Sequence, residues 1–195
     1  YGFDGTAGAV VVLDHLSGRN VDVGWTLTAP DGTTVLDVII GDRAVTLPQD
    51  GRYLLTLRGN AVDSTGTYSF ALLAAPAPQR FALAVGATVA PGVPGPGAGD
   101  LEAPGARDEY TFPAGAGDEL VLDHLSGSNV ALGWTLTAPD GTTVFDTVLG
   151  DRAVTLPQGG TYRLTVRGNA ADRTGTYSFH LGLRAATHEH PIGYG

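Results

Sequence analysis

The sequence contains no cysteine, no methionine and no lysine, so all eleven of its basic residues are arginine. Without cysteine the chain forms no disulfide and no thiolate metal site. Since translation begins with methionine, we expect the chain to be a processed or excised piece of a longer product. No apolar run approaches the roughly 20 residues that a membrane helix requires, and we therefore predict no membrane insertion.

Positive charge is also scarce, because the net charge is −9. A nucleic-acid-binding face needs clustered Arg or Lys, and the arginines here are scattered, so we predict no nucleic-acid partner. Asp outnumbers Glu by sixteen to four. Asp favours turns whereas Glu favours helices, and this imbalance indicates a loop-rich β-protein.

The chain does contain an internal repeat. Residues 10–73 match residues 119–182 without a gap, and 47 of these 64 positions are identical. We therefore expect two copies of one fold in series. Repeated modules are typical of binding and structural proteins, because linked sites gain avidity, whereas an active site is rarely built twice in one short chain.

The repeat predicts four segments. Ala-Pro-Ala-Pro at residues 75–78 is an extended, stiff sequence that favours a spacer between the copies. The expected segments are a first unit at 1–75, a linker at 76–80, a second unit at 81–184 and a C-terminal tail at 185–195.

Strand periodicity dominates both copies. Tyr162, Leu164 and Val166 alternate with polar residues, as in a half-buried strand. Short alternating segments separated by turns such as Ala29-Pro30-Asp31-Gly32 predict an all-β protein of two tandem antiparallel β-sandwiches, jelly-roll-like in type. The aromatic residues expected in the cores are Trp25, Trp134, Tyr53, Tyr162, Tyr68, Tyr177, Phe70 and Phe179.

The first copy begins partway through the pattern, since Tyr1 and Phe3 align with Tyr110 and Phe112. It therefore lacks a counterpart of residues 81–109. If that segment supplies an edge strand to the second unit, the first unit has an open edge at Tyr1 and Phe3. We expect a neighbouring copy or an upstream segment to fill it.

A set of motifs marks the second copy and recurs in part in the first. They are Asp108-Glu109-Tyr110-Thr111-Phe112, the glycine turn at Gly115 to Gly117, Gly160-Thr161-Tyr162-Arg163-Leu164-Thr165-Val166 and Gly175-Thr176-Tyr177-Ser178-Phe179. In these motifs both copies resemble the bacterial pre-peptidase C-terminal (PPC) domain. The resemblance implies a compact, non-catalytic β-sandwich that is appended to secreted hydrolases or arrayed in bacterial surface proteins.

Some PPC-like domains bind calcium through acidic residues near the start of the domain. Here the resemblance assigns that role to Asp100, Glu102 and Asp108. We predict no other cofactor.

Three further patterns have alternative interpretations. Asp14-His15-x-Ser17 looks like part of a catalytic triad, but successive strand residues point to opposite faces, which favours a strand end and turn. The two imidazoles of His188-Glu189-His190 are either a metal site or part of an exposed terminus. The outward row that includes Thr135 and Arg167 is either a contact face or an ordinary solvent face.

The leading hypothesis is a non-catalytic structural or adhesive module of a large secreted or cell-surface bacterial protein. It associates with neighbouring repeats or with copies of itself, and forms a fibre by edge-strand complementation. The alternative is an accessory module of a secreted hydrolase that binds a polysaccharide or a fibrous protein. An enzyme is the least favoured class, because no set of titratable groups is gathered by the expected fold.

Overall fold

The computed structural model describes residues 1–18, 23–127 and 131–185. Within these ranges the chain forms eighteen β-strands and no helix, which confirms the all-β fold class. Consequently no described helix is long and apolar enough to cross a membrane. The expected tail and its histidine pair lie outside the described residues, apart from Ala185.

The chain divides into two compact units. The first comprises Tyr1–Ala77 with Ala103–Ala106 and Gly168–Thr174, and the second comprises the remaining residues. The second unit starts earlier than expected, because its strand β8 spans Gln79–Ala82. Gln79 and Arg80 therefore belong to a sheet rather than to the linker.

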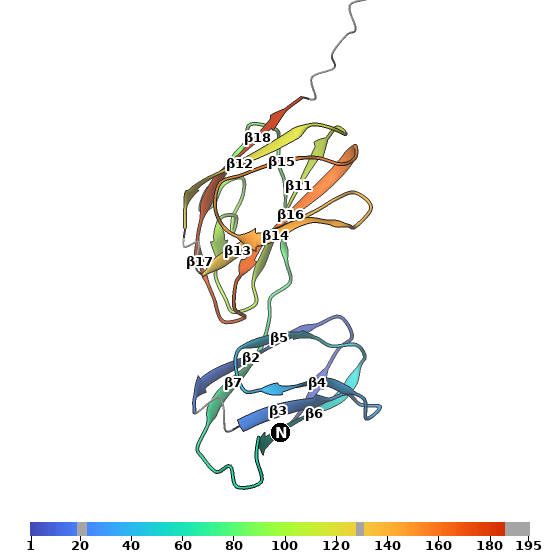
Figure 1. Cartoon of the computed structure of the whole chain (residues 1–195), viewed down its shortest axis with the longest axis vertical. Helices are drawn as coiled ribbons and strands as arrows, with labels where there is room; N and C mark the ends of the chain where they lie inside the picture. Colours follow the sequence, from blue (N-terminus) through green and yellow to red (C-terminus); the bar gives the residue numbers. More distant parts are fainter. Residues whose placement is uncertain (19–22, 128–130, 186–195) are drawn as a thin grey trace, which may run out of the picture. The chain divides into compact units, whose positions relative to one another are not determined.

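The first unit, here called unit 1, consists of two antiparallel sheets. Figure 1 shows β2, β5 and β7 in one layer and β3, β4 and β6 in the other. One sheet has the order β1 (Gly2–Gly5), β6 (Gly51–Gly59), β3 (Val23–Thr28), β4 (Thr34–Ile39), and the other has the order β5 (Arg43–Thr46), β2 (Val10–Ser17), β7 (Ser69–Ala74).

The second unit, here called unit 2, repeats this arrangement and adds strands to it. Its larger sheet has the order β14 (Thr143–Val148), β13 (Leu132–Thr137), β16 (Gly160–Gly168), β11 (Arg107–Ala114), β8, and the facing sheet has the order β15 (Arg152–Thr155), β12 (Glu119–Ser126), β18 (Ser178–Arg184), β9 (Thr88–Val89). A third, small sheet pairs β10 (Asp100–Leu101) with β17 (Gly175–Thr176). Strand β8 runs parallel to β11, whereas β11 and β16 are antiparallel, as expected for the sandwich.

Each core contains a tryptophan, in agreement with the alternation along its strand. Trp25 and Trp134 have no exposed surface. The ring of Trp25 meets Phe70 edge to face at 5.9 Å between centroids, and Trp134 meets Phe179 in the same way at 5.8 Å. Such edge-to-face pairs add to the free energy gained from burial. The two cores are thus built from the same aromatic contact.

Local turn chemistry joins β3 to β4. The amide of Gly32 donates a hydrogen bond to the carbonyl of Ala29 at 2.9 Å, and Gly32 has a φ of 86°. That conformation favours glycine because it has no Cβ. The Asp31 carboxylate accepts hydrogen bonds from the amide and hydroxyl of Thr33, which lower the pKa of Asp31. Pro30, Asp31 and Gly32 thereby form the predicted hairpin turn.

One expected core residue lies elsewhere. Tyr68 is 38% exposed, whereas its counterpart Tyr177 is fully buried, so the placement of Tyr68 in the core is wrong. The difference arises because the amide of Tyr177 binds the carbonyl of Gly99, which belongs to a segment that covers this end of unit 2. Phe70 is likewise only partly buried, although it packs against the core of unit 1.

Candidate functional site

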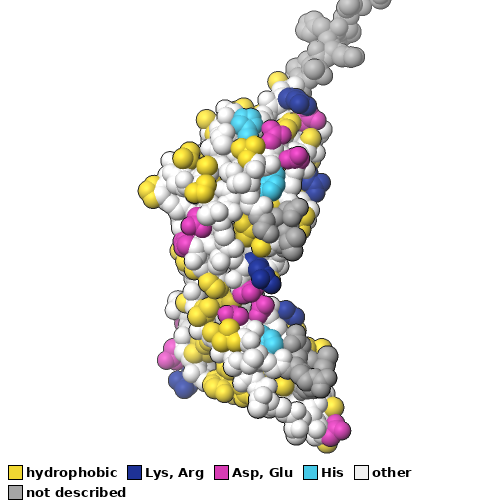
Figure 2. All heavy atoms as spheres, turned by 90° about the vertical axis from the view of Figure 1, so that its left-hand side faces the viewer, with side chains coloured by type: hydrophobic (Ala, Val, Ile, Leu, Met, Phe, Trp, Pro, Cys, Tyr) yellow, Lys and Arg dark blue, Asp and Glu magenta, His cyan; other side chains and the backbone are white. Residues whose placement is uncertain are grey.

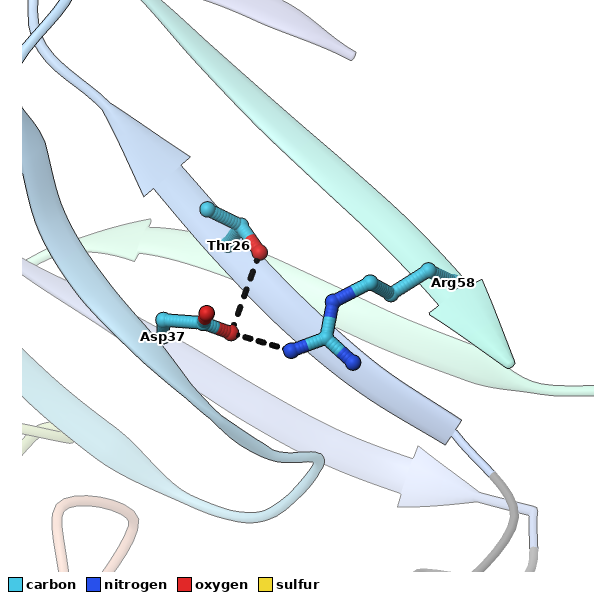
Figure 3. Close-up of polar contacts among 3 residues, drawn as sticks. All are labelled: Thr26, Asp37 and Arg58. Carbon is cyan, nitrogen blue, oxygen red and sulfur yellow. Dashed lines mark hydrogen bonds and ion pairs between the residues drawn. The ribbon is translucent and has the colours of Figure 1, made fainter. Parts of the chain in front are cut away.

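The outer face of each larger sheet presents one repeated polar group. In unit 1, Asp37 on β4 accepts a hydrogen bond from the Thr26 hydroxyl on β3 at 3.2 Å and forms an ion pair with Arg58 on β6 (Figure 3). The side chains of Asp37 and Arg58 are 51% and 46% exposed. The group therefore offers solvent an anion and a cation held in place across three strands.

Unit 2 contains the same group. The Thr135 hydroxyl donates to Asp146 at 3.1 Å, and Arg167 forms the ion pair. These side chains bind one another across the sheet, and the Thr135 hydroxyl donates its proton to Asp146. Partly exposed polar side chains of this kind can form hydrogen bonds and ion pairs with a surface that contacts the sheet.

A buried carboxylate lies at one end of unit 2. Asp108 is 1% exposed, and one of its oxygens accepts hydrogen bonds from the hydroxyls of Tyr110 and Tyr177. Those hydroxyls also lie 2.8 Å apart, and the Gly99 amide donates to Tyr110 at 3.1 Å. Burial raises the pKa of Asp108 from 3.8 to about 6, and it also raises the pKa values of both tyrosines.

The expected calcium ligands have other partners. Asp108 is committed to the tyrosines, Glu102 accepts a hydrogen bond from the Gln79 amide at 2.6 Å, and Asp100 pairs with Thr176 in β10. Calcium needs six to eight oxygen ligands. Among the described residues no group of three or more His, Asp or Glu side chains is placed to hold a metal ion, so the assignment of these three carboxylates to one site is corrected.

The Asp-His-x-Ser motif also has a structural explanation. The backbone amide of His15 donates to Asp42 at 2.9 Å, and the amide of His124 donates to Asp151 at 2.8 Å. The hydroxyl of Ser17 lies 2.6 Å from the hydroxyl of Ser69 on the neighbouring strand. The serine is thus paired across the sheet, as expected for a strand end.

Unit 1 contains a hollow next to its exposed tyrosines. It has a volume of about 310 Å³, and its lining includes Val23, Leu57, Gly66 and Tyr68. The Tyr68 hydroxyl lies 3.4 Å from the hydroxyl of Tyr1, which raises the pKa of Tyr68. The same two positions in unit 2 are the tyrosines that bind Asp108.

Sequence reasoning missed the role of these tyrosine pairs. Asp108 and Tyr110 are two residues apart on one strand, so their side chains share a face. That spacing is a usable signal for a buried contact between them. The partner Tyr177 comes from 69 positions further along the chain, and no local pattern indicates this pairing.

Charged side chains are dispersed over the described surface. On the face that Figure 2 shows, Arg side chains stand apart from one another, between acidic and uncharged side chains, and they form no continuous basic patch.

No protein-family model and no curated protein sequence matches the chain. Solved structures with a similar fold include a periplasmic inhibitor of g-type lysozyme from Aeromonas hydrophila, with 16% identity over 55% of this chain and all of that chain, at a TM-score of 0.42. They also include the pre-peptidase C-terminal domain of a collagenase from Bacillus anthracis, with 16% identity over 55% of this chain and 95% of that one, at a TM-score of 0.38. Likeness at this level concerns the β-sandwich fold alone.

Proposed function

We propose that this chain is a non-catalytic, PPC-like structural or adhesive module of a large secreted or cell-surface bacterial protein. Its two units act as spacers that join end to end or to other copies, and β-strand pairing at an open sheet edge provides the association. The repeat in the sequence supports this proposal, because linked modules gain avidity.

The outer edge of β1 is the observation that carries the proposal. In unit 2 the corresponding strand β11 pairs with β8 on this side. Among the described residues no strand pairs with β1 there, although β1 is bound on its other side to β6. An edge with free backbone groups is a template for a strand from another segment.

The geometry indicates which backbone groups of β1 are available. The terminal ammonium of Tyr1 donates a hydrogen bond to the carbonyl of Leu55 on β6, and the carbonyl of Tyr1 accepts one from the Leu55 amide. Because consecutive residues of a strand direct their hydrogen bonds to opposite sides, those of Gly2 point to the open edge. In unit 2 the carbonyl of Thr111, the counterpart of Gly2, accepts a hydrogen bond from the Leu83 amide at 2.8 Å.

Blocking this edge tests the proposal. Gly2→Pro removes the outward amide and leaves the hydrogen bonds between Tyr1 and Leu55 in place, whereas Gly2→Ala is the matched control with the amide retained. We expect light scattering to show that the mass of the wild-type chain and of Gly2→Ala rises with concentration. The mass of Gly2→Pro should stay at that of one chain.

Self-association is ruled out if the wild-type chain remains a single chain at all concentrations. The rival function, binding of a polysaccharide or a fibrous protein, has the repeated Asp37 and Asp146 groups as its surface. A pull-down on insoluble cellulose, chitin and collagen distinguishes the two. Retention of the monomer, and its loss in an Asp37→Ala, Asp146→Ala double variant, would favour the rival.

A further inference from the structure

A contiguous set of side chains is exposed in unit 1 but buried in unit 2. Tyr1 is 66% exposed and Tyr68 is 38% exposed, whereas their counterparts Tyr110 and Tyr177 are fully buried. The same holds for three apolar positions next to the core. Leu57, Phe70 and Leu72 are partly buried, while their counterparts Val166, Phe179 and Leu181 have no exposed surface.

In unit 2 a single segment, Gln79–Asp108, covers the side chains that are exposed in unit 1. It contributes β8 to the edge of β11, β9 to the edge of β18 and β10 to β17. The counterparts of these three edges in unit 1 are β1, β7 and the stretch Gly66–Thr67. No strand within the described residues pairs with any of the three on the corresponding side.

The segment covers unit 2 with its own apolar side chains. Val89, Ala98 and Leu101 are fully buried, and Leu83 is 5% exposed. Leu101 pairs with Gly175, whose counterpart Gly66 lines the hollow of unit 1. The hollow therefore lies at the position that this part of the segment covers in unit 2.

The segment also ends on a charged group with a defined partner. Asp108 receives hydrogen bonds from the hydroxyls of Tyr110 and Tyr177. In unit 1 the hydroxyls of Tyr1 and Tyr68 already lie 3.4 Å apart, and Tyr68 lines the hollow. In unit 2 the same pair of hydroxyls binds a carboxylate, which is a stronger acceptor than a neutral oxygen.

We infer that unit 1 is the acceptor for a peptide segment of the Gln79–Asp108 type, which adds strands to β1 and β7, fills the hollow and brings an aspartate to Tyr1 and Tyr68. This inference rests on the proposed function and names the partner of the open edge. A second copy could lend its own segment only by uncovering Val89 and Leu101 in its unit 2. The occupant that fills the hollow is therefore a separate segment of the kind that stands before unit 2, whereas association with another copy involves strand pairing at the edge of β1 alone.

The test adds this segment to the full chain. Residues 79–109 are placed directly before Tyr1, since Glu109 precedes Tyr110 in unit 2. The reactivity of each tyrosine toward tetranitromethane is then followed by mass spectrometry. We expect nitration of Tyr1 and Tyr68 to slow at least tenfold, to the level of Tyr110 and Tyr177 in the same sample.

Unfolding of unit 1 gives a second measurement. In a Trp134→Phe background the fluorescence of Trp25 reports on this unit alone, and the added segment should raise its melting temperature by about 5 °C or more. The matched control carries Asp at the added copies of Leu83 and Leu101, and it should neither protect Tyr68 nor raise the melting temperature.

The two proposals fail in different ways. If Tyr68 reacts as fast with the added segment as without it, and the melting temperature of unit 1 is unchanged, the acceptor site is refuted even where the unmodified chain self-associates. If the segment protects Tyr68 but the unmodified chain stays monomeric, the acceptor site stands and self-association is refuted.

Discussion

The buried carboxylate of unit 2 makes its stability depend on pH in an unusual direction. Burial raises the pKa of Asp108 from 3.8 to about 6. Between these pH values the folded protein holds a proton on Asp108 that the unfolded chain releases. The contribution of Asp108 to the free energy of unfolding is therefore most favourable below pH 3.8, and it is lost as the pH rises through 6. A difference of about two pH units between the folded and unfolded pKa values corresponds to about 3 kcal/mol, most of it lost between pH 4 and pH 7.

Asp108→Asn removes this titration. The amide oxygen still accepts a hydrogen bond from Tyr177, but no charge develops in the buried site. We therefore expect the free energy of unfolding of the variant to rise by about 2 kcal/mol relative to that of the wild type as the pH goes from 4 to 7. Asp123→Asn is the matched control in the same unit, since the Asp123 side chain is 54% exposed.

Urea unfolding measures the effect. A Trp25→Phe background leaves Trp134 as the reporter of unit 2, and the free energy of unfolding is determined at intervals from pH 4 to pH 7.5. Parallel pH profiles for the wild type and Asp108→Asn would refute the reasoning, because they would mean that Asp108 titrates alike in the folded and unfolded chains.

Three further predictions concern the stability of the two units, each measured as the free energy of unfolding in urea. Trp134→Ala should destabilise unit 2 by about 3–5 kcal/mol, as large-to-small changes in a core do, and a loss below about 1 kcal/mol would contradict its burial. Asp37→Ala should lower the free energy of unfolding of unit 1 by less than about 1 kcal/mol, because its ion pair with Arg58 is half exposed. A larger loss would mean that the pair stabilises the unit more than an exposed ion pair does. Gly99→Ala should lower the free energy of unfolding more than Gly141→Ala does. Both glycines have a positive φ, but only the Cβ added at Gly99 would meet backbone, at 2.5 Å from Ala90. Equal losses of stability would argue against that close contact.

Local patterns were sufficient to predict the strands and turns that the two units share. Tyr162, Leu164 and Val166 are fully buried, because successive side chains of a strand point to opposite faces of the sheet and these three face the core. The hairpin turn at Pro30 and Gly32 was equally predictable, since Pro fixes φ and Gly accepts a positive φ.

Burial of the last strand could not be read from its own residues. Thr67-Tyr68-Ser69-Phe70 and Thr176-Tyr177-Ser178-Phe179 are the same four residues, yet only Tyr177 and Phe179 are fully buried. The cover over Tyr177 comes from a distant segment whose strands β9 and β10 are two residues long. Two residues show no periodicity, so neither strand was predictable.

The buried carboxylate illustrates the same limit. The resemblance assigned Asp108 to calcium, whereas the structure gives it to two tyrosines. The spacing between Asp108 and Tyr110 is local and indicates a shared face, but the approach of Tyr177 depends on how β10 and β17 pair. Contacts between distant segments are set by the packing of the whole unit, which no short window of the sequence contains.

The wrapping of unit 2 by its first segment sets an order of events during synthesis. Tyr177 follows its partner Asp108 by 69 positions. At about 5–20 residues per second, a ribosome needs roughly 3–14 s to make the intervening chain. During that interval β17 and β18, which the apolar residues of 79–101 cover in the folded unit, have not yet been made. These apolar residues are therefore exposed to chaperones and can pair with strands of other chains.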